Sequence, residues 1–358
     1  MSKERIVMSI NNLTGKVQTV LGSIEPSELG KTLTHEHILF DGSWAGSLFE
    51  SATDQSFYEK PVSQEILGII RHRGKLNKDN SRLNDIDDAI YEVGLFKQHG
   101  GGTLVDATSI GIGRDPVGLM RVSRVTGVNI VMGGSYYVDS HHYPEMENFT
   151  EDEIFEKIIR DVMEGVDGTG IKTGVIGEVG CSWPLTPNEI KVLRASARAQ
   201  KNTGAPLLIH PGRDENAPME IIGIIEDVGA DLSQTIMGHL DRTVFEKTTF
   251  KKIAQTGCYM EWDLFGWGGS YYYINLNVDM PSDDQRLARI AWICSEGYEN
   301  KIVIAHDICG KHRLQKYGGH GYHYILDHVA PRMKDRGFTE DWIHKILVTN
   351  PASALTFS

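Results

Sequence analysis

Six side chains of the types that bind transition metals fall at the ends of short apolar runs. His35 and His37 are two residues apart, so on a β-strand both rings would point to the same face. Imidazole nitrogens and carboxylate oxygens are the usual ligands of zinc in proteins, but two such histidines are equally compatible with hydrogen-bonded core residues. The other four candidates each close a separate apolar run: Glu178, His210, His239 and Asp307.

The convergence of six such groups makes a metal site the better interpretation. In a barrel of parallel strands, the carboxyl ends meet at one rim, where barrel enzymes carry their catalytic groups. Burying ionisable side chains there without partners would be costly, and shared metal ligation removes that cost. Four histidines and two carboxylates predict two divalent metal ions per chain, with zinc first and manganese, iron or cobalt as alternatives.

The elements that would position these groups follow a regular alternation. From about residue 31, short apolar runs alternate with amphipathic stretches, a pattern typical of βα units in a parallel sheet. Capping boxes at Thr150, Thr186 and Ser282 predict helix starts, and Gly204 predicts a helix end. We expect strands at 32–37, 103–107, 129–133, 174–178, 206–210, 235–239, 258–263 and 302–307.

Eight such units predict an α/β fold, a (β/α)8 TIM barrel with the binuclear metal site at the C-terminal rim of the strands. On periodicity alone, an open doubly wound sheet is the competing arrangement. We expect residues 1–358 to form a single hydrolase domain, with a short N-terminal β segment at 14–30 and a barrel over about 31–350. Residues 41–85 are too long for a βα loop, so they predict an insertion near the site.

Composition narrows the possible partners and locations. The net charge of -12 argues against a broad nucleic-acid surface, which needs an excess of Lys and Arg. No apolar run approaches the roughly 18 residues of a membrane span, so no membrane association is expected. The four cysteines form no CxxC pair, and the first residues lack the apolar core of a signal peptide. These features favour a cytoplasmic location.

Several motifs resemble the phosphotriesterase-like amidohydrolases over nearly the whole chain: THEH at 34–37, GEVG at 177–180, IHPGR at 209–213, GHLDR at 238–242 and KYGGHGYHY at 316–324. The stretches 14–22 and 177–185 are similar to the animal phosphotriesterase-related branch in particular. The bacterial phosphotriesterases bridge their ions with a carbamylated lysine. Here Glu178 takes the place of that lysine, and Lys172 lies too early in the strand to replace it.

The resemblance also implies a division of the ligands between the two ions. His35, His37 and Asp307 would hold the more buried ion, and His210 with His239 the more exposed one. Glu178 would bridge the two ions. A water molecule shared by the ions would attack the substrate, and Asp307 would take up its proton and pass it to the leaving group.

The substrate follows from the same resemblance. The animal branch hydrolyses N-acetyltaurine to acetate and taurine, which implies a small anionic amide, an N-acyl amino sulfonate, as the substrate here. A lactonase or phosphotriesterase using the same site is the alternative activity. A protein that binds metal without turnover is the alternative from another class.

Four residues are candidate contacts to that substrate. Arg213 and Arg242 each lie three residues beyond a ligand histidine and could bind the sulfonate, although pairing with the neighbouring Asp214 or Asp241, or with another acidic group of the rim, is an equal alternative. Tyr136 follows the third strand and could line the pocket. Trp267 lies in the glycine-rich stretch 265–270, which could form a lid. A homodimer is a further expectation.

Overall fold

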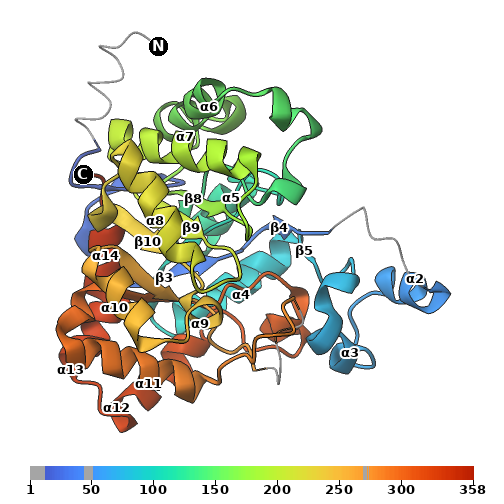
Figure 1. Ribbon diagram of the computed structural model, residues 1–358. Coiled ribbons are helices and arrows are strands. Elements are labelled where there is room, and N and C mark those ends of the chain that lie inside the picture. The colour runs from blue at the N-terminus through green and yellow to red at the C-terminus, as the bar shows by residue number, and fades with distance from the viewer. Residues whose placement is uncertain (1–12, 44–50, 269–271, 273) are drawn as a thin grey trace.

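Eight parallel strands form the centre of the computed structural model, which describes residues 13–43, 51–268, 272 and 274–358 (Figure 1). Each predicted strand is present, with its bounds shifted by a few residues at most. The barrel strands are β3 (Lys31–Glu36), β6 (Gly101–Asp106), β7 (Asn129–Met132), β8 (Ile176–Gly180), β9 (Leu207–His210), β10 (Thr235–Met237), β11 (Tyr259–Trp262) and β12 (Ile302–Ile304).

Hydrogen bonds between neighbouring strands close these strands into a ring. The ladder β3-β6-β7 is three-stranded, and the ladder from β8 to β12 is five-stranded. A parallel bridge between Gly133 and Val175 joins the two ladders on one side. On the other side, the backbone N–H of Asp307 donates to the carbonyl of His35 at 3.1 Å. The predicted closed barrel is therefore confirmed, and the doubly wound sheet is excluded.

Helices surround this ring, as Figure 1 shows. The three predicted capping boxes are all formed, with Thr150, Thr186 and Ser282 as the N-caps. Gly204 ends its helix in the left-handed conformation (φ 70°), which glycine adopts without steric cost. The longer helices are α4 (Ile86–Gln98), α5 (Pro116–Thr126), α6 (Glu151–Met163), α7 (Pro187–Thr203), α8 (Ala217–Val228), α10 (Lys247–Gln255) and α11 (Asp283–Ile293), and α12 (Ala330–Asp335), α13 (Glu340–His344) and α14 (Asn350–Leu355) follow β12.

One apolar cluster fills the barrel interior beneath the predicted ligands. Leu208 is two residues before His210, so the two side chains share the inward face of β9. Leu208 is fully buried in a cluster with Val131 and Val303 from other strands, and Leu355 of α14 joins it. The rigid packing of these side chains fixes the strands that carry the candidate ligands.

The region predicted as an insertion forms a separate small layer beside the barrel. It begins at β4 (Phe40–Asp41), which pairs antiparallel with β5 (Arg82–Leu83). Between them lie α2 (Ala52–Tyr58), α3 (Leu67–Arg73) and the short 3-10 helix Gly74–Leu76. A small core of Phe57, Ile66 and Ile70 holds this layer together. In the N-terminal segment, β1 (Val17–Thr19) pairs with β2 (Gly22–Ile24).

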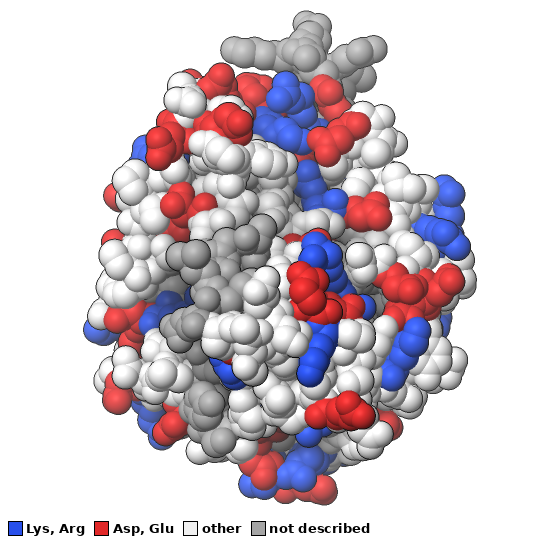
Figure 2. All heavy atoms as spheres, turned by 90° about the vertical axis from the view of Figure 1, so that its right-hand side faces the viewer, with Lys and Arg blue, Asp and Glu red and all other residues white. Residues whose placement is uncertain are grey.

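On the molecular surface, Figure 2 shows acidic and basic side chains interspersed over the face that carries the insertion. Within the described residues, no helix is both long and apolar enough to cross a membrane.

Candidate metal centre

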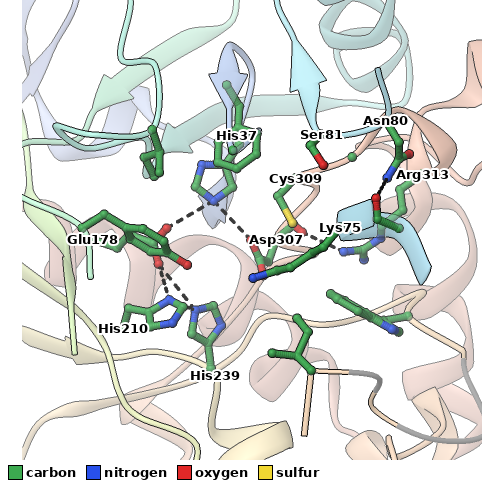
Figure 3. A pocket seen from close by; sticks show the side chains of 18 of the residues that line it. His37, Lys75, Asn80, Ser81, Glu178, His210, His239, Asp307, Cys309 and Arg313 are labelled. Atoms are coloured by element: carbon green, nitrogen blue, oxygen red, sulfur yellow. Dashed lines mark hydrogen bonds and ion pairs between the residues drawn. The ribbon is translucent and has the colours of Figure 1, made fainter. Parts of the chain in front are cut away.

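Glu178 lies at the centre of the site, and Figure 3 shows its carboxylate facing the rings of His37, His210 and His239. Its Oε1 is 3.3 Å from His37 Nε2. Its Oε2 is 2.7 Å from His210 Nδ1, 3.4 Å from His35 Nε2 and 3.5 Å from His239 Nε2. One carboxylate thus contacts histidines from three segments of the rim, at the ends of β3, β9 and β10, an arrangement that would suit a bridging ligand.

Asp307 completes the group from the opposite side. Its Oδ1 lies 3.2 Å from His37 Nε2. Potential ligand atoms of His35, His37 and Asp307 all lie within 4.8 Å of one another, and so do those of His35, Glu178 and His239. The structure therefore brings all six predicted side chains together at one rim of the barrel.

Two of these ligand positions have unusual backbone conformations. His239 has φ 53° and Asp307 has φ 52°, a left-handed region that non-glycine residues rarely adopt. The surrounding hydrogen bonds hold them there, since the N–H of His239 donates to Asp263 Oδ2 at 2.8 Å. Non-glycine residues in this conformation cluster at functional sites, where the fold enforces a side-chain direction.

A second layer of buried acceptors fixes the direction of the histidine rings. Nδ1 of His239 is 2.7 Å from Asp263 Oδ1, and Nδ1 of His35 is 3.2 Å from Glu261 Oε2. Nδ1 of His37 is 2.9 Å from the Thr108 hydroxyl. These contacts leave the Nε2 atoms of the three rings directed at the central cavity, as is usual for metal-binding histidines.

This second layer was not predicted from the sequence, although the spacing of its residues is a recognisable pattern. Glu261 and Asp263 are two residues apart at the end of β11, the same spacing that identified His35 and His37 on β3. Glu36 behaves as strand alternation predicts and points away from the cavity. Its carboxylate accepts from the backbone N–H groups of His306 and Ile308 and so fixes the loop that carries Asp307.

The protonation of these groups is strongly perturbed by their proximity. Burial opposes charge on His37, but its contacts with Asp307 and Glu178 raise its pKa to about 9. Burial also disfavours the Asp307 anion, yet the hydrogen bond from His37 lowers the pKa of Asp307 to about 2. For His210, burial and the adjacent His239 lower the pKa well below the ordinary value. The Asp307 carboxylate is thus anionic at neutral pH and can bind a cation.

The chemistry of this donor set fits divalent metal ions. Among the described side chains, His35 Nε2 is a fully buried nitrogen without a hydrogen-bond partner. His210 Nδ1 and His239 Nε2 lie only 2.7 Å apart, and both face the Glu178 carboxylate. Buried lone pairs that converge in this way are satisfied by a cation with nitrogen and oxygen ligands.

The pocket beside this centre contains three of the four predicted substrate contacts. Arg213, Arg242 and Trp267 line it, together with all the metal-ligand candidates except His35. Tyr136 is not among the described residues that line it; the side chain is buried, with its ring edge-on to His142 at 6.1 Å between ring centroids. The adjacent Tyr137 lines the pocket instead, because alternate residues of the segment after β7 face opposite sides.

The two arginines do not form the predicted neighbour pairs. Arg213 Nε donates to the Tyr272 hydroxyl at 3.0 Å, and Arg242 donates to the Thr243 hydroxyl and the Pro211 carbonyl. Gly269 and Ser270 of the predicted lid lie outside the described residues. Sequence reasoning also missed pocket residues from the insertion and from the loop after β12: Lys75, Asn80, Ser81, Cys309 and Arg313.

Comparison with known proteins identifies the family of this chain. The phosphotriesterase family model matches residues 15–355. A phosphotriesterase-related protein of Nematostella vectensis is 48% identical over 349 residues, covering 96% of this chain and 99% of the relative. The N-acetyltaurine hydrolase of Homo sapiens is 45% identical over 351 residues, covering 97% and 100%. The crystal structure of a resiniferatoxin-binding protein from Rhodobacter sphaeroides superimposes with a TM-score of 0.91 at 37% identity, covering 95% of each chain. Matched over nearly its full length in sequence and fold, this chain belongs to the phosphotriesterase family of metal-dependent hydrolases.

Proposed function

We propose that this chain is a binuclear zinc amidohydrolase that cleaves a small N-acyl amino sulfonate such as N-acetyltaurine. His35, His37 and Asp307 would hold one ion, His210 and His239 the second, and Glu178 would contact both. When bound, such ions activate a water molecule and polarise the oxygen of the scissile group. We also propose that residues 1–358 act as one hydrolase domain.

Asp307 is the residue best placed to move a proton during this reaction. Its side chain is 13% exposed, whereas those of His37 and Glu178 are 2% exposed. A general acid or base must reach both the attacking water and the leaving group, so it needs access to the cavity. Asp307 would accept the proton of the water on its carboxylate and deliver it to the departing amine nitrogen.

The charge distribution of the pocket is the observation that supports an anionic substrate. Among the described lining residues, the only carboxylates are Glu178 and Asp307, and both face histidines of the metal centre. Lysine and arginine side chains line the same pocket. A pocket with this excess of cations favours a substrate that brings negative charge. The N-acetyltaurine hydrolases among the relatives, at 43–46% identity, support a sulfonate as that charge.

A panel of substrates tests this proposal. The purified, zinc-loaded protein would be assayed for acetate release from N-acetyltaurine and N-acetyl amino acids, and for turnover of lactones and phosphotriesters. We expect N-acetyltaurine to give the highest kcat/KM. Turnover of lactones or triesters alone would replace the amidase proposal with the alternative activity on the same centre. Metal binding without turnover of any of them would favour a binding protein.

A further inference from the structure

Lys75 brings an ammonium group from the insertion into the same pocket as the metal-ligand candidates. It lies in the 3-10 helix Gly74–Leu76, directly after α3, and lines the pocket together with Glu178 and Asp307. Figure 3 shows its side chain pointing into the cavity. The residue keeps solvent-accessible surface, whereas protein atoms surround its ammonium group. Lys75 is therefore accessible to a small ligand in the pocket.

The charge of Lys75 is not balanced by the described part of the protein. Within those residues, its ammonium makes no hydrogen bond or ion pair. Enclosure by protein and repulsion from Arg213 lower its pKa, and Arg242 adds to that repulsion. Across the pocket, burial and the charge of Lys75 lower the pKa of His141 to about 4, so this histidine stays neutral at pH 7. An ammonium in this position gains from an anion that the protein does not itself supply.

The arginines of the pocket differ in how far the protein already uses their donors. Arg313 donates to the carbonyls of Asp307 and Phe265, at 2.7 and 3.0 Å. Arg242 is 2% exposed and donates to the Thr243 hydroxyl and the Pro211 carbonyl, and its Nη2 lies 3.2 Å from His210 Nε2. These two arginines mainly hold loops of the rim.

Arg213 uses fewer of its hydrogen-bond donors within the protein. Its Nε donates to Tyr272, while among the described residues its two terminal nitrogens have no hydrogen-bond acceptor. It is half-buried in the wall of the pocket. Lys75 and Arg213 together therefore offer unused donors from two separate elements, the insertion and the loop after β9.

We infer that Lys75 and Arg213 form an anion subsite that binds the sulfonate of the substrate, so the insertion determines which charge the enzyme accepts. This inference rests on the proposed amidase function for the identity of the anion. A sulfonate has three acceptor oxygens and can take hydrogen bonds from both cations at once. The amide carbon would then lie toward Glu178 and Asp307, on the metal side of the pocket.

Binding of an isolated sulfonate tests the subsite without any turnover. Ethanesulfonate would be titrated calorimetrically into the metal-loaded wild-type protein, Lys75→Met and Lys78→Met. Lys78 belongs to the same insertion but pairs with Glu59 at 3.5 Å and does not line the pocket, so it is a matched control. Loss of one charge-assisted hydrogen bond should weaken binding about 10- to 100-fold in Lys75→Met only, and Lys75→Arg should recover most of the loss.

Equal binding by Lys75→Met and wild-type protein, or no binding by wild-type protein, would overturn the subsite. Turnover separates this result from a failure of the proposed function. For N-acetyltaurine, the kcat/KM of Lys75→Met should fall by a similar factor, mainly through a higher KM. For N-ethylacetamide, which lacks the sulfonate, the kcat/KM of this variant should equal that of the wild type. A wild-type protein that binds ethanesulfonate but does not cleave N-acetyltaurine would refute the proposed amidase and leave the subsite standing.

Discussion

The metal-ligand rim and the insertion contribute to one pocket in different ways. Five of the six ligand candidates lie at or just beyond the ends of barrel strands, Glu178 lies within β8, and the apolar interior fixes the positions of these strands. The insertion has a small core of its own, and it contributes Lys75 from a three-residue helical turn. In our proposal, the barrel positions the reacting groups, while the insertion supplies contacts to the rest of the substrate. This division predicts that changes in the rim abolish chemistry and changes in the insertion alter selectivity.

Removal of the central carboxylate should have the largest effect. Glu178→Ala takes away the group that faces all four histidines, so we expect loss of bound metal and a fall in kcat of about 1000-fold or more. Elemental analysis and an amidase assay would measure both. Glu226→Ala, at an exposed position on α8, is the control and should retain both properties. A fully metallated and active Glu178→Ala protein would contradict the bridging role.

Asp307→Asn should separate metal binding from proton transfer. The amide keeps the shape and one oxygen ligand but cannot accept a proton, so kcat should fall about 100- to 10,000-fold while metal is retained. The measurement is kcat together with the metal content of the same sample. Unchanged turnover would restrict Asp307 to a structural role as a ligand.

Substitutions in the second layer of acceptors should cause intermediate losses of metal affinity. Asp263→Asn removes the charged acceptor of His239, and loss of such a partner lowers metal affinity about 10- to 100-fold. Thr108→Val removes a neutral partner of His37 and should cost less. Competition with a zinc chelator would measure and rank the zinc affinities of the two variants. Equal affinities in both variants and the wild type would show that strand geometry alone orients the rings.

The contrast between rim and insertion also explains what the sequence could reveal. The fold and the convergence of the ligand candidates were predictable because strand periodicity and polar strand ends are local patterns, as at His210 after its apolar run. Lys75 carried no such signal, since its role depends on how an irregular segment folds back over the barrel. Tyr136 and Tyr137 show the same limit, because the segment after β7 determines which ring faces the pocket.

Proton release on metal binding should be a smaller effect, but it reports directly on the protonation of His37 at the rim. The pKa of His37 is raised to about 9 in the metal-free protein, so the ring is protonated at pH 7 and must lose that proton to bind a cation. Zinc titrations at pH 7 in buffers of different ionisation enthalpy should show proton release, which should decline as the pH rises through 9. A binding enthalpy that does not depend on the buffer would contradict this account.

Counting the metal ions tests the central claim most directly. The purified protein would be saturated with zinc, freed of excess ion by gel filtration and examined by elemental analysis, with Glu178→Ala treated in parallel. A binuclear centre predicts two zinc ions per wild-type chain and fewer in the variant. Zero or one ion per wild-type chain would contradict it.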